Sequence, residues 1–300
     1  DLVDVQRRTP GLQATHAASG SGRGGHFFVR GLGQVDFITT TEPGVGLYLD
    51  GVYLGRVSGA ALDLTDIDSI EVIRGPQGAI WGKNNIGGAI VVATTPPSPD
   101  NERAISLRVG NLNRYEIGGL FNQAVLPERL SLRGSAKLIR SDGYSTRRTD
   151  GVDVGSNEDM LGRLQLRFRA SDTLSLTGAV DGLRRNAHVS ANSMVGFAAT
   201  DLSTQYSALV GPIDARYIQL KPGITDSAVR PSDELRQWGT ALTIDWRPGP
   251  WAVRSVTAYR TMNQDTAGDF DGTPLPFPEP DIAMAQQQMP QEIQVRRDLL

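Results

Sequence analysis

A glycine-rich stretch near the N-terminus could bind a dinucleotide. "GSGRGG" (20–25) places Gly20, Gly22 and Gly25 in the spacing G-x-G-x-x-G. A dinucleotide-binding fingerprint also needs a strand before it, a helix opening at it, and an acidic residue about 20 positions later. Here "QATHAAS" precedes the glycines and the strand-like "HFFVRG" follows them. The context therefore favours a loop over a cofactor site.

An acidic stretch near the C-terminus could bind calcium. "DTAGDFDGTP" (265–274) contains Asp265, Asp269 and Asp271. Carboxylate oxygens are the ligands that Ca²⁺ prefers, but the spacing is not that of an EF-hand loop. A solvated acidic loop is favoured over a metal site.

The remaining reactive residue types form no recognisable constellation. The three histidines have no paired ligand spacing, namely His16, His26 and His188. The chain has no cysteine, so disulfides and thiolate metal sites are excluded. Its net charge of −3 implies no broad nucleic-acid surface. We predict no enzyme, no metal, no cofactor and no nucleic-acid partner.

The elements that carry these residues are predicted to be mostly β. The 300 residues suggest roughly two domains, and no apolar run reaches the ~18 residues of a transmembrane helix. Residues 2–12 could form one short helix, and "GAALDLTDIDSIEVI" (59–73) a helical turn or two before a strand at 70–74. The chain opens on "DLVDVQRRTPGLQ", which is no signal peptide. Either the protein is cytoplasmic, or the numbering begins downstream of a removed or missing segment.

The composition changes near residue 95. Residues 1–95 are rich in glycine, whereas segments from Arg103 onward alternate with period two. Between them, "TTPPSPDN" (94–101) is typical of a linker, because proline cannot donate to a strand ladder. We predict an N-terminal domain at 1–95, a linker at 96–102 and a second domain at 103–300.

The clearest alternation lies in "ELRQWGTALTIDWRPG" (234–249). Trp238, Leu242 and Trp246 fall on one face, with small and polar residues on the other. The pattern fits a soluble sheet with one face on a core, or a transmembrane barrel strand with aromatic residues at both interfaces. At ~3.3 Å per residue and a tilt near 40°, the two tryptophans span roughly 20 Å of the bilayer normal.

Neighbouring segments favour the barrel. "MLGRLQLRFRA" (160–170) and "WAVRSVTAYR" (251–260) set apolar residues against arginines, and "LSLTGAV" (174–180) alternates in the same way. A soluble core would rarely oppose so many arginines to so few acids within a strand. The predicted membrane-interface aromatics are Trp238, Trp246, Trp251 and Tyr259.

Connection lengths give a second signal for a barrel. Eight strands are predicted near 104–110, 114–125, 129–141, 160–170, 173–183, 234–247, 251–263 and 286–297. Short and long connections alternate, as in outer-membrane barrels, except for a short one after the first strand. Eight strands enclose only enough room for side chains. Residues 1–95 must therefore lie outside a small barrel, or inside a larger one whose other strands are absent here.

A long stretch decides between these two arrangements. "FFVRGLG" (27–33), "GVGLYLDGVYLGR" (44–56) and "DIDSIEVIRGPQGAIWGKNNIGGAIVV" (66–92) resemble the plug domain of TonB-dependent outer-membrane receptors. "RSDGY" (140–144) and "PQEIQVRR" (290–297) resemble early barrel strands of that family. The resemblance implies a mainly β fold, with an incomplete transmembrane antiparallel barrel of about eight strands and a small α+β plug, and an open sheet partly wrapped around that plug.

The resemblance also implies a function. A family member in the bacterial outer membrane takes up a scarce ligand, most commonly a ferric siderophore. TonB, energised by ExbB/ExbD, pulls on the plug through an N-terminal box expected upstream of Asp1. Outer-membrane lipid surrounds the barrel. Uptake of a carbohydrate, cobalamin or another compound stays open, as do a non-transporting adhesin and a soluble β-rich enzyme.

Specific plug residues follow from the same resemblance. A sharp corner at Gly75–Pro76, positive φ or close approach at Gly78 and Gly82, and a core position for Trp81 are expected. The full set of structural motif residues is Gly31, Gly51, Gly75, Pro76, Gly78, Trp81, Gly82, Gly87 and Gly88. Arg30 and Arg74 are expected to pair with barrel glutamates beyond Leu300, the alternative being that they cap local carbonyls. The ligand-contact candidates are Arg23, Gln34, Asp36, Phe37, Tyr53, Arg56, Tyr206 and Tyr217.

Overall fold

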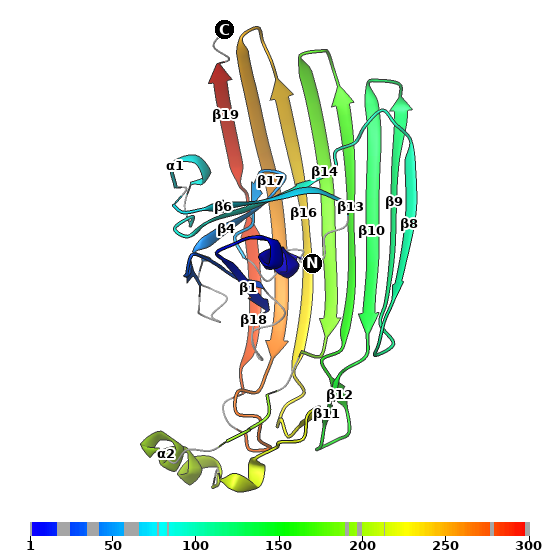
Figure 1. The fold of residues 1–300 in the computed structure, drawn as a ribbon. Coiled ribbons are helices and arrows are strands. Elements are labelled where there is room, and N and C mark those ends of the chain that lie inside the picture. Colours follow the sequence, from blue (N-terminus) through cyan, green and yellow to red (C-terminus); the bar gives the residue numbers. More distant parts are fainter. Residues whose placement is uncertain are drawn as a thin grey trace.

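The structure is a computed structural model in which a plug lies against one face of a large sheet (Figure 1). It describes residues 2–16, 25–34, 42–56, 66–76, 78–82, 84–189, 192–196, 200–212, 214–276 and 279–297. Among these residues, no helix is long and apolar enough to cross a membrane.

The plug is built from two small sheets. The first, in the order β1-β2-β3, follows the 3-10 helix η1 (Leu2–Arg8) and contains β1 (Leu12–His16), β2 (Gly25–Val29) and β3 (Leu32–Gly33). The second, in the order β5-β4-β7-β6, contains β4 (Val45–Leu49), β5 (Val52–Tyr53), β6 (Ile67–Arg74) and β7 (Gly88–Thr94). In the second sheet β4 and β7 run parallel, so this sheet is mixed. Both sheets contribute to one apolar core, in which Val29, Val45 and Ile90 are almost fully buried.

Strand β6 begins earlier than the sequence predicted. It starts at Ile67, so residues 67–69 are extended and not helical. Ile67, Ile70 and Val72 pack against the plug core while β6 pairs with β7, and this tertiary contact overrides the helical pattern. The earlier part of the predicted helical turns, residues 57–65, lies outside the described residues.

The glycines between β6 and β7 serve two purposes. Gly75 and Gly82 have φ of +98° and +73°, conformations that favour glycine. Gly87 and Gly88 allow close passage, because a Cβ there would lie 2.6 Å from the Leu32 carbonyl oxygen and 2.1 Å from that of Ile73, and Gly88 also has a positive φ of +143°.

The positive φ predicted for Gly78 and the core position predicted for Trp81 are wrong. Gly78 opens the short helix α1 (Gly78–Trp81) without positive φ, and a Cβ there would meet nothing within 4 Å. Trp81 does not fill the plug core. It is half-buried and packs on Tyr48, with the two ring centroids 4.7 Å apart, because α1 projects from the sheet edge (Figure 1).

The large sheet is one antiparallel array with the order β18-β17-β16-β14-β13-β10-β9-β8, and β19 also pairs with β17. Its strands are β8 (Glu102–Val109), β9 (Tyr115–Leu126), β10 (Leu130–Ser141), β13 (Asn157–Arg169), β14 (Leu174–Ala187), β16 (Ser232–Trp246), β17 (Trp251–Ala267), β18 (Asp281–Gln288) and β19 (Gln291–Arg297). The sheet is open, which confirms the predicted incomplete barrel.

The eighth strand position is interrupted. Strands β18 and β19 pair with successive parts of β17, on either side of Met289 and Pro290. Proline has no N–H to donate to a ladder, although the Pro290 carbonyl still accepts from the Ala258 N–H at 2.9 Å. The predicted strand 286–297 therefore starts five residues earlier, at Asp281, and is broken once.

Connections at the two ends of the sheet differ in length (Figure 1). Residues 127–129, 170–173 and 247–250 join strands at what we call the short-turn end. The opposite, long-loop end carries β11 (Ser145–Arg147), β12 (Asp153–Val154), α2 (Asp201–Val210), η2 (Ala215–Tyr217) and β15 (Ile224–Thr225). The exceptional short connection, 110–114, belongs to the long-loop end because β8 runs towards it.

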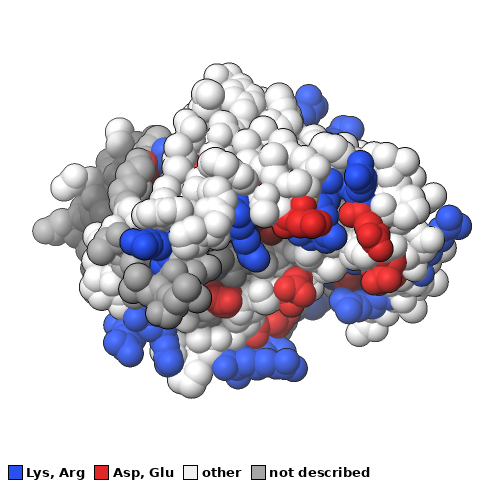
Figure 2. Space-filling view, turned by 90° about the horizontal axis from the view of Figure 1, so that it is seen from above, with Lys and Arg blue, Asp and Glu red and all other residues white. Residues whose placement is uncertain are grey.

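The two faces of the sheet differ in chemistry. Leu164, Leu166 and Leu242 point away from the plug and are 42–45% exposed. The predicted interface aromatics share that face, with Trp238 48%, Trp246 46% and Trp251 43% exposed, and the rings of Trp238 and Tyr259 lie 5.5 Å apart. The plug-facing side carries most of the charged residues. Seen from the short-turn end, acidic and basic side chains are intermixed (Figure 2).

Candidate functional site: the plug–wall interface

Two ion links join the plug to the inner face of the sheet, here called the wall. In the first, Arg133 of β10 donates to both carboxylate oxygens of Asp66, from Nε and Nη2, each at 2.6 Å. Its Nη1 also donates to Glu102 at 2.8 Å. Arg133 and Asp66 are almost fully buried, so the guanidinium is paired where an unpaired charge would be strongly unfavourable.

The second link starts from the turn between β4 and β5. Asp50 and Gly51 have φ of +51° and +84°, the paired positive values of a type I′ hairpin turn. The Asp50 carboxylate accepts from the Thr94 backbone N–H and hydroxyl, each at 2.8 Å, and from Arg163 Nη2 of β13 at 2.5 Å. Gln165 completes the contact by donating to the Thr94 hydroxyl at 3.0 Å. Asp50 therefore joins the hairpin, the end of β7 and the wall.

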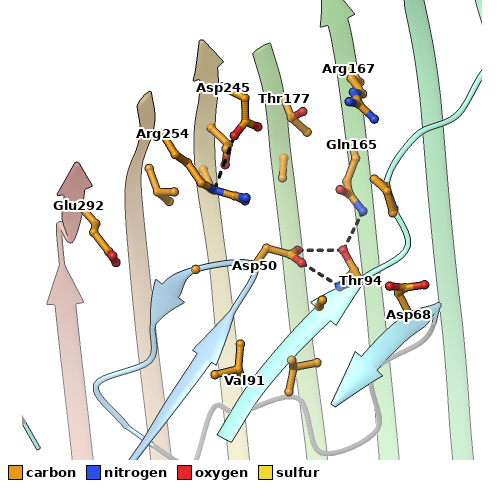
Figure 3. A pocket seen from close by; sticks show the side chains of 18 of the residues that line it. Asp50, Asp68, Val91, Thr94, Gln165, Arg167, Thr177, Asp245, Arg254 and Glu292 are labelled. Carbon is orange, nitrogen blue, oxygen red and sulfur yellow. Dashed lines mark hydrogen bonds and ion pairs between the residues drawn. The ribbon is translucent and has the colours of Figure 1, made fainter. Parts of the chain in front are cut away.

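A cavity of about 500 Å³ opens beside Asp50, between β7 and the wall (Figure 3). Its lining comes from β13, β14, β16, β17 and β19 as well as the plug. Charged side chains of both signs face it, namely Asp50, Asp68, Arg163, Arg167, Asp245, Arg254 and Glu292. The wall residues Arg167, Asp245 and Arg254 lie close to the turns 170–173 and 247–250, so the cavity extends towards the short-turn end.

A second cavity of about 840 Å³ lies along β19 and is lined by Tyr48, Tyr53 and Trp81 of the plug. Tyr48 donates its hydroxyl proton to the Trp81 carbonyl, and Asn85 donates to the Tyr48 oxygen at 2.9 Å. Tyr53 is half-buried, and its hydroxyl accepts from Asn84 at 3.0 Å.

The other ligand-contact candidates lie in different places. Arg56 follows β5, is half-buried, and donates to the Gly55 carbonyl at 2.8 Å. Gln34 follows β3. Tyr217 lies in η2, in the long loop between β14 and β16, and the Arg216 guanidinium is 5.7 Å from the centroid of its ring. The structure brings Tyr53 and Arg56 together on one hairpin. Arg23, Asp36, Phe37 and the side chain of Tyr206 lie outside the described part of the chain.

Arg30 and Arg74 are both exposed. Arg74 donates to the Pro10 carbonyl at 3.2 Å, which is the local capping that the sequence left open as an alternative. Arg30 has φ of +52°, and its backbone N–H donates to Gly11 at 2.7 Å. Within the described residues neither guanidinium has a carboxylate partner, so their pairing with barrel glutamates stays a prediction.

The long-loop end is organised around one buried carboxylate. Asp269, fully buried, accepts from the backbone N–H groups of Ala228 (2.8 Å), Asp271 (3.0 Å) and Gly272 (2.7 Å). Burial, reinforced by the neighbouring Asp269, raises the pKa of Asp271 to about 6. Among the described residues, no group of three or more His, Asp or Glu is placed to hold a metal ion.

Asp50, Asp66, Arg133 and Arg163 were missed as site residues by the sequence reasoning. The period-two pattern placed Arg163 on the polar face, but nothing local gave its partner. The apparent excess of arginines within single strands is balanced by acids on the plug and on other strands.

Comparison with known proteins bears directly on this architecture. Residues 1–89 match the family model described as "TonB-dependent Receptor Plug Domain". The plug therefore belongs to the TonB-dependent receptor family. Members of this family are outer-membrane β-barrel proteins and not enzymes, so the sheet is placed in the outer membrane.

The chain is similar in sequence to two curated relatives. It is 30% identical over 234 residues to the pesticin receptor of Yersinia enterocolitica, an alignment covering 74% of this chain and 30% of that protein. It is 28% identical over 159 residues to the vitamin B12 transporter BtuB of Vibrio cholerae, covering 51% of this chain and 24% of that one. The chain thus spans less than a third of the curated relatives' length.

Solved structures show the same fold. The ferric yersiniabactin uptake receptor FyuA of Yersinia pestis superposes with a TM-score of 0.76 at 22% identity, over 98% of this chain and 42% of that one. The siderophore receptor PiuA of Acinetobacter baumannii gives 0.72 at 13% identity, over 99% and 40%.

Proposed function

We propose that this receptor is an active transporter that takes up a scarce ligand across the outer membrane, with energy supplied through TonB. The observation that carries the proposal is the plug hairpin, which is docked by Asp50 onto the inner face of a membrane-type sheet. A domain held there obstructs the lumen, so ligand passage requires work on the plug. That work is the role proposed for TonB and the ExbB/ExbD complex.

The ligand that we propose is a ferric siderophore. Two of the similar structures, PiuA and PirA of Acinetobacter baumannii, are described as siderophore receptors, and FyuA is described as a ferric yersiniabactin uptake receptor. The relative titled as a vitamin B12 transporter makes cobalamin the second candidate. We assign ligand contact to Tyr53 and Arg56 on the plug hairpin and to Tyr217 in the loop region, and we keep Arg23, Gln34, Asp36, Phe37 and Tyr206 as further candidates.

The same proposal divides the chain and assigns two further roles. Residues 1–95 form the plug, 96–102 the linker and 103–300 the first part of the barrel. Arg30 and Arg74 pair with carboxylates on the rest of the barrel. Trp238, Trp246, Trp251 and Tyr259 lie at the membrane interfaces, consistent with their outward-facing positions.

Growth of a strain lacking the full-length receptor tests the function. On single iron sources, we expect the deletion to abolish growth with one ferric siderophore, and plasmid-borne receptor to restore growth only in cells with functional TonB. Growth on cobalamin in a strain that requires it is the second arm. Binding of the ligand with no TonB-dependent uptake would instead identify a surface receptor that does not transport.

A further inference from the structure

One row of directly paired wall residues crosses the sheet beneath the plug hairpin. Arg163 of β13 pairs in register with Asp181 of β14, Asp181 with Gly239 of β16, Gly239 with Arg260 of β17, and Arg260 with Gln288 of β18. Residues in register across neighbouring strands point to the same face of a sheet. These five residues, here called the seat, therefore all face the plug.

The seat holds the hairpin at both of its ends. Asp50, in the turn, accepts from Arg163 at 2.5 Å. At the other end, the backbone around β5 is bound by the Gln288 side chain. The Gln288 amide nitrogen donates to the Tyr53 carbonyl at 2.6 Å, and its amide oxygen accepts from the Gly55 N–H at 3.0 Å. Between these points Val52 packs against Val256 and Ala258 of β17. The hairpin thus docks through two polar ends and an apolar centre.

Glycine at position 239 makes the seat possible. Arg260 reaches over β16 to donate to both oxygens of Asp181, at 3.1 and 2.7 Å. A Cβ at Gly239 would lie 2.9 Å from Arg260 Nη1 and 3.0 Å from its Cγ and Cζ. Any larger residue would therefore displace the guanidinium that crosses this strand.

Charge explains why the seat accepts a carboxylate. Asp181 binds Arg260 and also accepts from Arg163 Nη1 at 2.8 Å, so two guanidinium groups share one wall carboxylate. Arg163 and Arg260 are each only 9% exposed, where an uncompensated positive charge is unfavourable. The Asp50 carboxylate of the plug completes the neutral set.

We propose that the Asp50–Arg163 contact is the latch of the plug hairpin, and that Asp181, Gly239 and Arg260 are positioning residues that hold Arg163 ready for it. Releasing Asp50 joins the 500 Å³ cavity to the lumen on the long-loop side of the seat. The inference rests on the proposed function, since it specifies which contact must break before a ligand can pass.

Cysteine accessibility tests the latch in the full-length receptor. Ala179 lines the cavity on the short-turn side of the seat, and these 300 residues contain no cysteine, so Ala179→Cys adds a single reporter thiol to this region. Whole cells are treated with a bulky maleimide that does not cross the outer membrane. With Asp50→Asn or Arg163→Gln, we expect labelling to accelerate at least about tenfold, as expected when a buried charge pair loses one partner.

The matched control is Arg167→Gln. Arg167 lies on the same strand and face and lines the same cavity, but it donates to Ser175 and not to Asp50. Its labelling rate should equal that of the parent, and the double variant Asp50→Asn/Arg163→Gln should label no faster than the faster single variant. Unchanged labelling in both latch variants, equal acceleration in Arg167→Gln, or multiplicative effects in the double variant would overturn the latch.

Two features keep the test decisive. If Arg163→Gln reduces the amount of folded barrel, Asp50→Asn decides alone, because it leaves every wall residue in place. Labelling measures opening and not uptake. A receptor that labels as expected but takes up no ligand would refute the proposed function and leave the latch standing.

Discussion

Asp66 on the plug binds the Arg133 guanidinium of the wall through both of its carboxylate oxygens, each 2.6 Å from a guanidinium nitrogen. Arg133 is only 4% exposed, so removing its charge leaves Asp66 buried without its main partner. We expect Arg133→Gln to lower the free energy of unfolding of the full-length receptor by about 3 kcal/mol. Denaturant-induced unfolding of the receptor in detergent measures this loss of stability.

Arg108→Gln is the control for this prediction. Its guanidinium pairs with Glu116 at 3.2 Å but is 75% exposed, so the loss should stay below about 1 kcal/mol. Equal destabilisation by the two variants would show that the Asp66 link contributes no more than a surface pair.

Gly88 should tolerate no side chain. Its φ is +143°, and a Cβ there would lie 2.1 Å from the Ile73 carbonyl oxygen, a backbone atom of the paired strand. Gly88→Ala should separate β6 from β7 and make the plug sensitive to protease. Gly82→Ala shares a positive φ but would meet nothing within 4 Å, so only the backbone strain of roughly 1 kcal/mol is expected. Limited proteolysis of both variants compares them, and a protease-resistant Gly88→Ala plug would contradict the packing argument.

Neighbouring positions on β16 should respond oppositely to charge. Leu242 is 42% exposed on the outward face, whereas Thr243 lines the plug-side cavity. Leu242→Arg should reduce the stability of the barrel in phospholipid bilayers, measured as the free energy of unfolding, by about 2–4 kcal/mol, because a guanidinium then faces hydrocarbon. Thr243→Arg should have a much smaller effect, since that side is polar. Urea titration of folding into vesicles makes the comparison, and similar losses at both sites would contradict the assigned faces.

Loop packing at the long-loop end should weaken as pH rises. The folded-state pKa of Asp271 is raised to about 6 from an ordinary 3.8, so the folded loop binds the proton more tightly than the unfolded chain. The resulting stabilisation is complete below pH 3.8 and is lost as pH rises through about 6. Hydrogen exchange in residues 268–276, corrected for intrinsic rates, should show stronger protection at pH 5 than at pH 7.5. Asp271→Asn should remove this difference, and a pH dependence that persists in the variant would assign it to another group.

The sequence by itself determined where the strands of the large sheet lie, apart from the start and the break of the eighth, and which residues face outward. The plug before them was identified by its resemblance to the plug domain of TonB-dependent receptors. Alternation with period two is a local property, since successive side chains of any strand point to opposite faces. The plug motifs are equally local, because Gly75 and Gly82 mark turns that need positive φ. Misjudged details, such as the start of β6, occurred where packing against the core outweighed local preference.

Only the tertiary structure decided which charges meet. Asp50 and Arg163 are 113 positions apart, and Asp66 and Arg133 are 67 apart. Their pairing depends on strand register across the wall and on how the β4–β5 hairpin docks there. A shift of one residue in register would turn Arg163 away from the plug. The role of Gly239 could not be predicted from the sequence either. Its lack of a side chain matters only because Arg260 and Asp181 lie on either side of it, and the pairing of the strands decides that.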